Sequence, residues 1–156
     1  NTLSIGLMAG TRLALTNNTL FGNGDVLITA EPRVGGCDGS ERLTARNNIF
    51  LGGKDHHQPS ERSALSWIGG CSSLSLDADY SVTYGVKGTC KIGGHDTCAD
   101  PKLGPLSGHA YGMVPKDGSP AIDTGLKVGG AVPGLDFNRQ KRPKGKGVDR
   151  GAFEAR

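Results

Sequence analysis

The chain has 156 residues, of which 26 are glycine and 8 are proline, and it carries a formal net charge of +3. This length allows one domain with its own core and excludes a second domain of ordinary size. The glycines lack the period of collagen, and together with the prolines they leave little room for helices of ordinary length. The composition therefore predicts an all-β chain. No apolar run approaches the ~20 residues of a transmembrane helix.

The N-terminal half repeats a strand pattern. Leu13-Ala-Leu-Thr-Asn-Asn-Thr-Leu-Phe-Gly matches Leu43-Thr-Ala-Arg-Asn-Asn-Ile-Phe-Leu-Gly, and a weaker copy is Leu74-Ser-Leu-Asp-Ala-Asp-Tyr-Ser-Val-Thr-Tyr-Gly. In each copy, short alternating apolar runs flank an Asn or Asp, which predicts strand, corner and strand. Self-similarity at about 30 residues is typical of stacked repeats.

The Asn or Asp at each corner has a physical role. Asn tolerates left-handed backbone geometry, and its amide can bond to the backbone and to the same residue of a neighbouring repeat. We therefore expect Asn18, Asn48 and Asp79 to stack as a ladder that satisfies the polar groups of a tight turn. The segment Asn1-Thr-Leu-Ser-Ile-Gly-Leu-Met already alternates as a strand does. A first strand without a cap would leave an open edge, so we expect further coils before it in a longer precursor.

Polar excursions at residues 31–41 and 52–60 separate the copies and predict loops on one side of the stack. The second holds Lys54-Asp-His-His, the densest group of titratable side chains. Adjacent histidines can bind a metal or supply a base, but neighbours on an extended chain point to opposite sides and rarely share one ion. The weak catalytic candidates are Arg46, Lys54, His56 and His57.

The four cysteines are an even number in a chain that looks secreted, which predicts two disulfides. Gly-Gly-Cys occurs at residues 35–37 and again at 69–71, close to one repeat apart, so stacking would bring Cys37 to Cys71. Cys90 and Cys98 would then close a local loop. The two other connectivities stay open, and so does structural zinc, although no CxxC pair or finger-type histidine spacing is present.

Asp77 and Asp79 lie two apart in an extended segment and would project to the same face. Two neighbouring carboxylates can bind Ca²⁺, or one can act as an acid and the other as a base. Alternatively, both residues serve only to stabilise the corner and the stacking of the repeats. We expect no cofactor other than this Ca²⁺ candidate. No Gly-x-Ser-x-Gly, His-Glu-x-x-His, Walker or dinucleotide motif is present, so nucleophilic and cofactor chemistry have no support in the sequence.

The tail contains a basic run, formed by Lys141, Arg142, Lys144 and Lys146. Such a run favours acidic polysaccharide or an anionic cell surface as a partner. Its interleaved Gly and Pro favour the alternative, a solvated loop. The run contains no aromatic residue for base stacking, which argues against a nucleic-acid partner.

Four ordered blocks end the chain. They are Asp100-Pro-Lys-Leu-Gly-Pro-Leu, Gly118-Ser-Pro-Ala-Ile-Asp-Thr-Gly, Asp136-Phe-Asn-Arg-Gln-Lys-Arg-Pro and Gly147-Val-Asp-Arg-Gly-Ala-Phe-Glu. In this order they resemble the C-terminal tail of bacterial secreted right-handed parallel β-helix proteins, the pectate-lyase-like superfamily that includes the choice-of-anchor surface proteins. The resemblance implies a fold that lyases, hydrolases, epimerases and adhesins share, so it leaves the activity open. Most acids of the blocks are expected to stabilise turns.

We therefore predict a right-handed parallel β-helix, a single-stranded solenoid, over residues 1–99, and an irregular tail over residues 100–156 that packs on it. The expected function is that of the C-terminal portion of a secreted, periplasmic or cell-surface protein that interacts with carbohydrate or a surface and is not catalytic on its own. One alternative is a polysaccharide lyase or glycoside hydrolase that acts on an acidic glycan. Another is a structural subunit or passenger fragment that caps or extends another protein.

Overall fold

The computed structural model describes residues 3–7, 10–21, 28–32, 39–52, 65–67, 75–86, 90–105, 112–127 and 132–155. Within these ranges the chain consists of short strands and turns with almost no helix, which confirms the all-β prediction. None of the described residues belongs to a helix long and apolar enough to cross a membrane.

The strands follow one another as three triplets, which we call repeats. The first repeat is β1 (Leu3–Leu7), β2 (Arg12–Thr16) and β3 (Thr19–Phe21); the second is β4 (Ile28–Pro32), β5 (Arg42–Arg46) and β6 (Ile49–Leu51); the third is β7 (Leu65–Trp67), β8 (Ser75–Asp79) and β9 (Val82–Tyr84). A last strand, β10 (Thr97–Cys98), follows.

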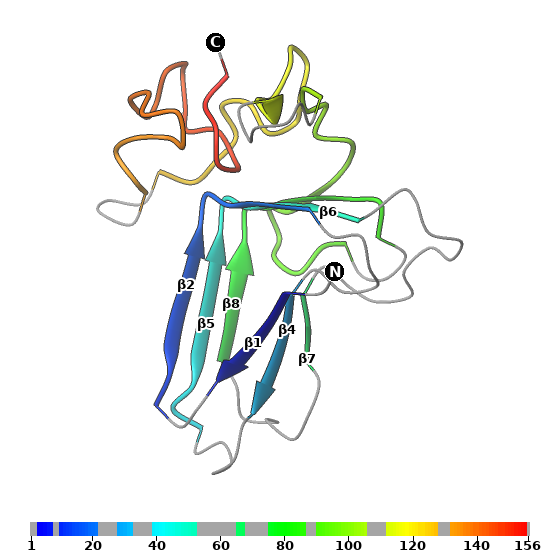
Figure 1. Cartoon of the computed structure of the whole chain (residues 1–156), viewed down its shortest axis with the longest axis vertical. Coiled ribbons are helices and arrows are strands. Elements are labelled where there is room, and N and C mark those ends of the chain that lie inside the picture. The colour runs from blue at the N-terminus through cyan, green and yellow to red at the C-terminus, as the bar shows by residue number, and fades with distance from the viewer. Residues whose placement is uncertain are drawn as a thin grey trace.

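Strands that hold the same place in successive repeats pair with one another in parallel. The three sheets have the orders β1-β4-β7, β2-β5-β8 and β3-β6-β9-β10 (Figure 1). The register stacks like residues, since Leu13 pairs with Leu43 and Leu43 with Leu76. In the sheet β2-β5-β8, apolar residues at alternate positions therefore form a column on one face, because side chains of a strand alternate between its faces.

The sheet β3-β6-β9-β10 is packed on both faces. On one face, Phe50 lies in a cluster with Ala45 of β5, and both are buried. On the other face, Ile49 and Val82 pack against Ala121 of the tail. A sheet covered on both sides is typical of parallel strands.

The tail, residues 99–155, contains no named strand apart from isolated bridges in the ranges described, and it lies over the sheet β3-β6-β9-β10 (yellow to red in Figure 1). Turns replace regular structure here, with main-chain bonds such as Ser119 N to Lys116 O and Arg139 N to Asp136 O. The tail is therefore held by side chains and turn contacts rather than by a sheet of its own.

Cys90 and Cys98 form a disulfide, as predicted. It closes the segment that leads from β9 into β10, so it covers the third repeat. The predicted Cys37 to Cys71 bond lies outside the described residues and stays a prediction.

Candidate functional site

The corners between neighbouring sheets carry a continuous ladder of side-chain acceptors. Asn48 Oδ1 accepts the main-chain N–H of Asn18 at 3.0 Å, and Ser81 Oγ accepts that of Asn48 at 3.3 Å. Asp96 Oδ1 in turn accepts the N–H of Ser81 at 2.7 Å. Each ladder oxygen thus bonds the corner residue of the preceding repeat.

The ladder corrects the predicted position of Asp79. In the parallel register Asp79 pairs with Arg46, two residues before the level of Asn48. The spacing from the second to the third repeat, set by Leu43 and Leu76, is longer than the one assumed from the polar residues. Ser81 therefore follows Asn18 and Asn48 in the ladder, and Asp79 does not.

The residue before each ladder position has left-handed backbone geometry. Asn17, Asn47 and Tyr80 have φ values of 56°, 55° and 58°. The prediction gave this role to the ladder asparagines, whereas the structure gives it to their neighbours. The side chains of Asn17 and Asn47 are buried and attach the tail, because Asn17 Nδ2 donates to Asp149 O at 2.8 Å and Asn47 bonds the main chain of Leu126.

Five acids of the tail bond to its own main chain. Asp100 accepts the N–H of Lys102; Asp123 that of Gly147; Asp136 those of Gln140 and Glu154; Asp149 those of Asp123 and Ala155; and Glu154 those of Lys144 and Asp149. These carboxylates hold turns together, as the sequence predicted for most of them. They are therefore poor candidates for acid or base chemistry on a ligand.

Asp149 and Glu154 are two of the buried carboxylates in this set. Burial raises the pKa of the Asp149 carboxyl above its ordinary value, against the N–H bonds from Ala155 and Asp123 that lower it. Glu154 Oε1 accepts a hydrogen bond from Arg142 Nη1 at 2.6 Å, and the two side chains are 0% and 2% exposed.

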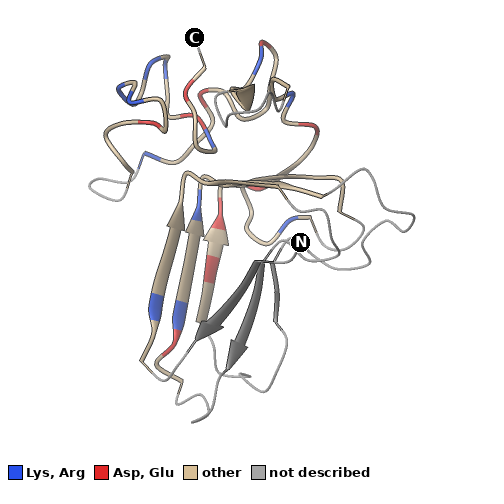
Figure 2. Cartoon of the chain, viewed as in Figure 1, with Lys and Arg blue, Asp and Glu red and all other residues tan. Residues whose placement is uncertain are grey.

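The sequence places Arg142 in the basic binding run, but in the structure its side chain is buried and is not available to a ligand. Its guanidinium also donates to the carbonyls of Asp149 and Gly151, so its charge is used inside the tail. Lys141, Lys144 and Lys146 remain exposed. Figure 2 shows blue segments in the part of the tail that lies beyond β2, on the first-repeat side.

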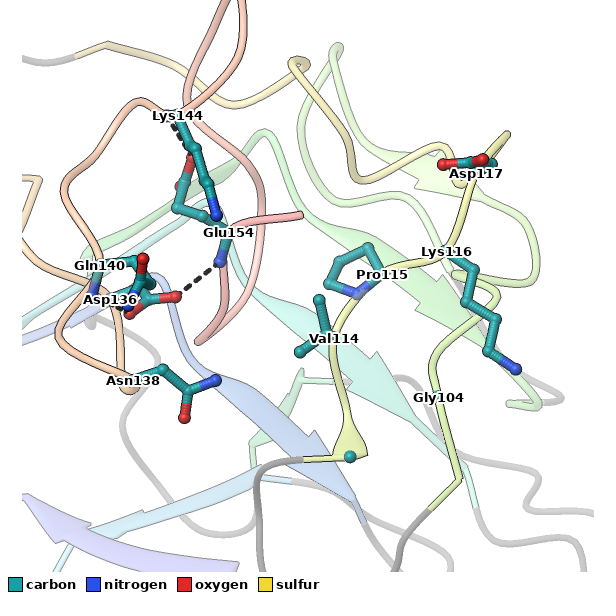
Figure 3. A pocket seen from close by; sticks show the side chains of 11 residues that line it. Gly104, Val114, Pro115, Lys116, Asp117, Asp136, Asn138, Gln140, Lys144 and Glu154 are labelled. Carbon is teal, nitrogen blue, oxygen red and sulfur yellow. Dashed lines mark hydrogen bonds between the residues drawn. The ribbon is translucent and has the colours of Figure 1, made fainter. Parts of the chain in front are cut away.

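A cleft of about 830 Å³ opens between two parts of the tail. Figure 3 shows Asn138 and Lys144 on one wall and Val114 and Pro115 on the other. Three acids line it: Asp136 and Glu154 accept main-chain N–H groups, and Asp117 is exposed. Asn138 Oδ1 is buried and has no hydrogen-bond partner within the described ranges. An amine and an amide beside an apolar wall could bind a saccharide that carries carboxylates and hydroxyls.

A second arrangement of titratable groups lies at the corner of the third repeat. Asp79 Oδ2 lies 2.8 Å from His95 Nδ1, and Asp79 Oδ1 accepts the His95 main-chain N–H at 2.7 Å. The His95 ring stacks on Tyr80 with centroids 4.3 Å apart. Burial of Asp79 acts to raise the pKa of its carboxyl, but the hydrogen bonds from His95 and Tyr80 outweigh it and lower that pKa below its ordinary value.

This arrangement fixes one imidazole nitrogen and leaves the ring largely exposed, since the His95 side chain is 62% exposed. A carboxylate on Nδ1 orients a histidine whose Nε2 can take a proton. The sequence reasoning did not single out His95. Its only local signal is the Gly93-Gly94 turn between the two bonded cysteines.

The two Ca²⁺ candidates each have a side-chain partner in the structure. Asp77 forms an ion pair with Arg46 of the neighbouring strand, and Asp79 is engaged by His95. In the portion of the chain described, no group of three or more His, Cys, Asp and Glu side chains is placed to hold a metal. Arg46 thus has a partner on its own sheet, while Lys54, His56 and His57 lie outside the described residues.

Comparison of this chain with protein-family models, with curated proteins and with solved structures gives no match.

Proposed function

We propose that the chain is the C-terminal portion of a secreted or cell-surface β-helix protein of the pectate-lyase-like kind, which binds acidic carbohydrate without catalysis of its own. Each repeat would be one turn of a right-handed parallel β-helix, and the tail would be its lateral cover. The proposal is supported by the stacked parallel repeats and by the order of the four tail blocks.

The non-catalytic part of the proposal is supported by the hydrogen bonds that the tail carboxylates accept. Asp136, Asp149 and Glu154 are buried and accept main-chain N–H groups, so they serve the turns of the tail. The tail exposes the amines of Lys141, Lys144 and Lys146 close together in the sequence, and its exposed acids, Asp100, Asp117 and Asp123, lie in other segments. Exposed cations attract a polyanion in a salt-dependent way.

Binding to pectate or alginate tests this function directly. Replacing Lys141, Lys144 and Lys146 by Gln should weaken binding, and raising the salt concentration should abolish the difference between variant and parent. The matched control replaces three exposed cations elsewhere, Arg12, Lys91 and Lys127, and should leave more of the binding intact. Equal losses in both variants would mean that net charge alone drives binding, and no binding by the parent would reject the function.

The enzyme alternative is favoured by one observation, the pair of Asp79 and His95. In that case His95 Nε2 would be the general base of a lyase or hydrolase acting on an acidic glycan. A lyase would release unsaturated uronate ends that absorb in the ultraviolet, and a hydrolase would release reducing sugars. We expect neither from this chain. Turnover that is lost in His95→Ala or Arg46→Ala, with folding preserved, would establish the enzyme instead.

A further inference from the structure

The sheet β3-β6-β9-β10 turns two rows of side chains toward the tail, which lies directly over it (Figure 1). The first row consists of Thr19, Ile49 and Val82. The second row consists of Phe21, Leu51 and Tyr84, which also pair in register. Residues two apart in a strand share a face, so both rows lie on the side of the sheet that carries the tail.

The tail closes over the first row. Ile49 and Val82 are 0% exposed, and both pack against Ala121. The main chain of Gly151 lies so close that a Cβ there would come within 2.6 Å of Ile49 Cδ1. This row therefore belongs to the interface between the repeats and the tail and is closed to a ligand.

The second row, which we call the aromatic row, is left open. Phe21 is 50% exposed and Tyr84 is 37% exposed, and Leu51 lies half-buried between them. Apolar residues scattered singly over a surface are ordinary, whereas contiguous ones mark sites of interaction. The three side chains come from equivalent positions of three successive repeats, so they form one continuous strip.

Glycine follows the aromatic row in every repeat, at residues 22, 52 and 85. Gly52 N donates to Tyr84 O at 2.8 Å, and a Cβ at Gly52 would come within 2.0 Å of Gly85 O. The second and third repeats therefore approach each other by their main chains directly after the row. Gly52 and Gly85 place no side chain beside the strip, and their close contact helps to fix the spacing of its members.

The spacing of the two rings suits a chain of sugar rings. Neighbouring strands lie ~4.8 Å apart, so the Cα atoms of Phe21 and Tyr84 are separated by two strand spacings, about 9.6 Å. This distance is close to the length of a disaccharide unit in a 1,4-linked pyranose chain. The C–H groups on one face of a pyranose ring pack well on an aromatic ring. A chain lying across the strands would thus stack one sugar on Phe21 and the next but one on Tyr84, with Leu51 under the sugar between them.

We infer that the aromatic row is a stacking subsite for a carbohydrate chain that crosses β3, β6 and β9. The inference rests on the proposed function and deepens it, because it gives the bound chain a second kind of contact. The lysines of the tail attract carboxylates, and this attraction weakens with salt. The rings of Phe21 and Tyr84 contact pyranose faces, which salt does not screen. The Tyr84 hydroxyl can in addition bond a hydroxyl of the sugar.

The narrowness of the strip argues against a protein or a lipid surface as its occupant. A stable protein interface buries about 800 Å² on each partner. The aromatic row is one residue wide, because the tail buries the row on one side of it and glycines follow on the other. A single file of rings at fixed spacing matches an extended polymer of flat units.

The test compares galacturonate oligomers of two, three and four units by NMR titration, at low and at high salt. Only a trimer or longer chain reaches both rings, so trigalacturonate should bind at least about fivefold more tightly than digalacturonate. Phe21→Leu combined with Tyr84→Leu should abolish this step. Leucine already occupies the centre of the row at Leu51, so these substitutions suit the fold. Phe137→Leu is the matched control, an exposed aromatic of the tail, and should keep the step.

The titration also locates the ligand. At high salt, trigalacturonate should shift the amide signals of residues 19–21, 49–51 and 82–84, and the double leucine variant should lose these shifts. Equal affinity of parent and double variant for trigalacturonate at high salt would overturn the inference. Shifts confined to the tail would overturn it as well.

The inference and the proposed function can fail separately. Low-salt binding that needs Lys141, Lys144 and Lys146 but is unchanged in the double leucine variant would keep the function and reject the aromatic row. Binding of neutral cellotriose through the row, with no binding of galacturonates, would keep the subsite and reject the acidic ligand. A parent that binds neither sugar would overturn both. A parent that dimerises in sedimentation, and becomes monomeric in Phe21→Asp, would make a second copy the occupant and overturn the subsite.

Discussion

The side chain of Asn47 pairs with the main chain of Leu126 through two hydrogen bonds. Its Nδ2 donates to Leu126 O at 2.9 Å, and its Oδ1 accepts the N–H of Leu126 at 2.7 Å. This buried amide imitates the hydrogen bonding of a strand neighbour and joins the tail to the middle repeat. Left-handed backbone geometry at Asn47 makes the arrangement accessible, since Asn adopts it more readily than most residues.

We predict that Asn47→Gly lowers the free energy of unfolding by about 2 to 3 kcal/mol, because two partly buried hydrogen bonds are lost and the main-chain groups of Leu126 are left unpaired. Glycine keeps the positive φ, so backbone strain does not contribute. Urea unfolding gives the energy, and hydrogen exchange at Leu126 should accelerate. Asn47→Gly with parental stability would mean that the tail does not depend on this corner.

Asn48→Leu should lower the free energy of unfolding by about 1 to 3 kcal/mol, because the Asn18 N–H loses its acceptor and Leu15 O its donor. Asn18→Leu is the matched control. Its side chain is half-buried at the end of the ladder, so the loss should be smaller. Thermal unfolding of the two variants compares them directly, and a larger loss for Asn18→Leu would contradict the ladder.

Arg142→Met should lower the free energy of unfolding by about 3 to 5 kcal/mol, because it leaves the Glu154 carboxylate buried without its cation. Adding Glu154→Gln should recover part of this loss, since the stranded charge is then absent. Arg142→Lys should restore little, because one ammonium cannot reach Glu154 and the carbonyls of Asp149 and Gly151 together. Additive effects of the two substitutions would show that Arg142 and Glu154 are not coupled.

Asp149 should give the stability curve a component that falls with rising pH. Its folded-state pKa is raised, so the folded chain holds this proton more tightly than the unfolded chain. The stabilisation is complete below the unfolded pKa and is lost as pH rises through the folded pKa. The free energy of unfolding of Asp149→Asn should therefore lie furthest below that of the parent in acid, and this difference should shrink toward neutral pH. Urea midpoints from acid to neutral pH measure this, and a constant difference would contradict the raised pKa.

The strand repeats were predictable because their signal is local. Alternating apolar residues on both sides of Asn17-Asn18 and Asn47-Asn48 defined the strands and their stacking. The third corner was misplaced because Tyr80-Ser81 replaces the asparagine pair there, and the neighbouring Asp79 looked like the missing amide. Pairing Leu76 with Leu43 would have set the register correctly, since apolar columns have to align in a buried stack.

The contacts of the candidate sites were less accessible to sequence reasoning. Asp79 and His95 meet only because the disulfide-closed segment folds back on the third repeat. Arg142 looks like its lysine neighbours in the sequence, yet its planar guanidinium suits a buried carboxylate and two carbonyls better than an ammonium does. Which of these side chains is buried and which contacts it makes depend on the packing of the tail.

The contacts that residues 149–151 of the tail make with successive repeats bear on how the molecule comes apart. Stacked repeats that touch only their neighbours can unravel from one end, one unit at a time. Here Asp149 bonds Asn17, Gly151 bonds Asn47 and Arg150 bonds Ser81, so a single short segment fastens all three repeats. Fraying of the first repeat would be resisted by the other two, and the stack would open in one cooperative step.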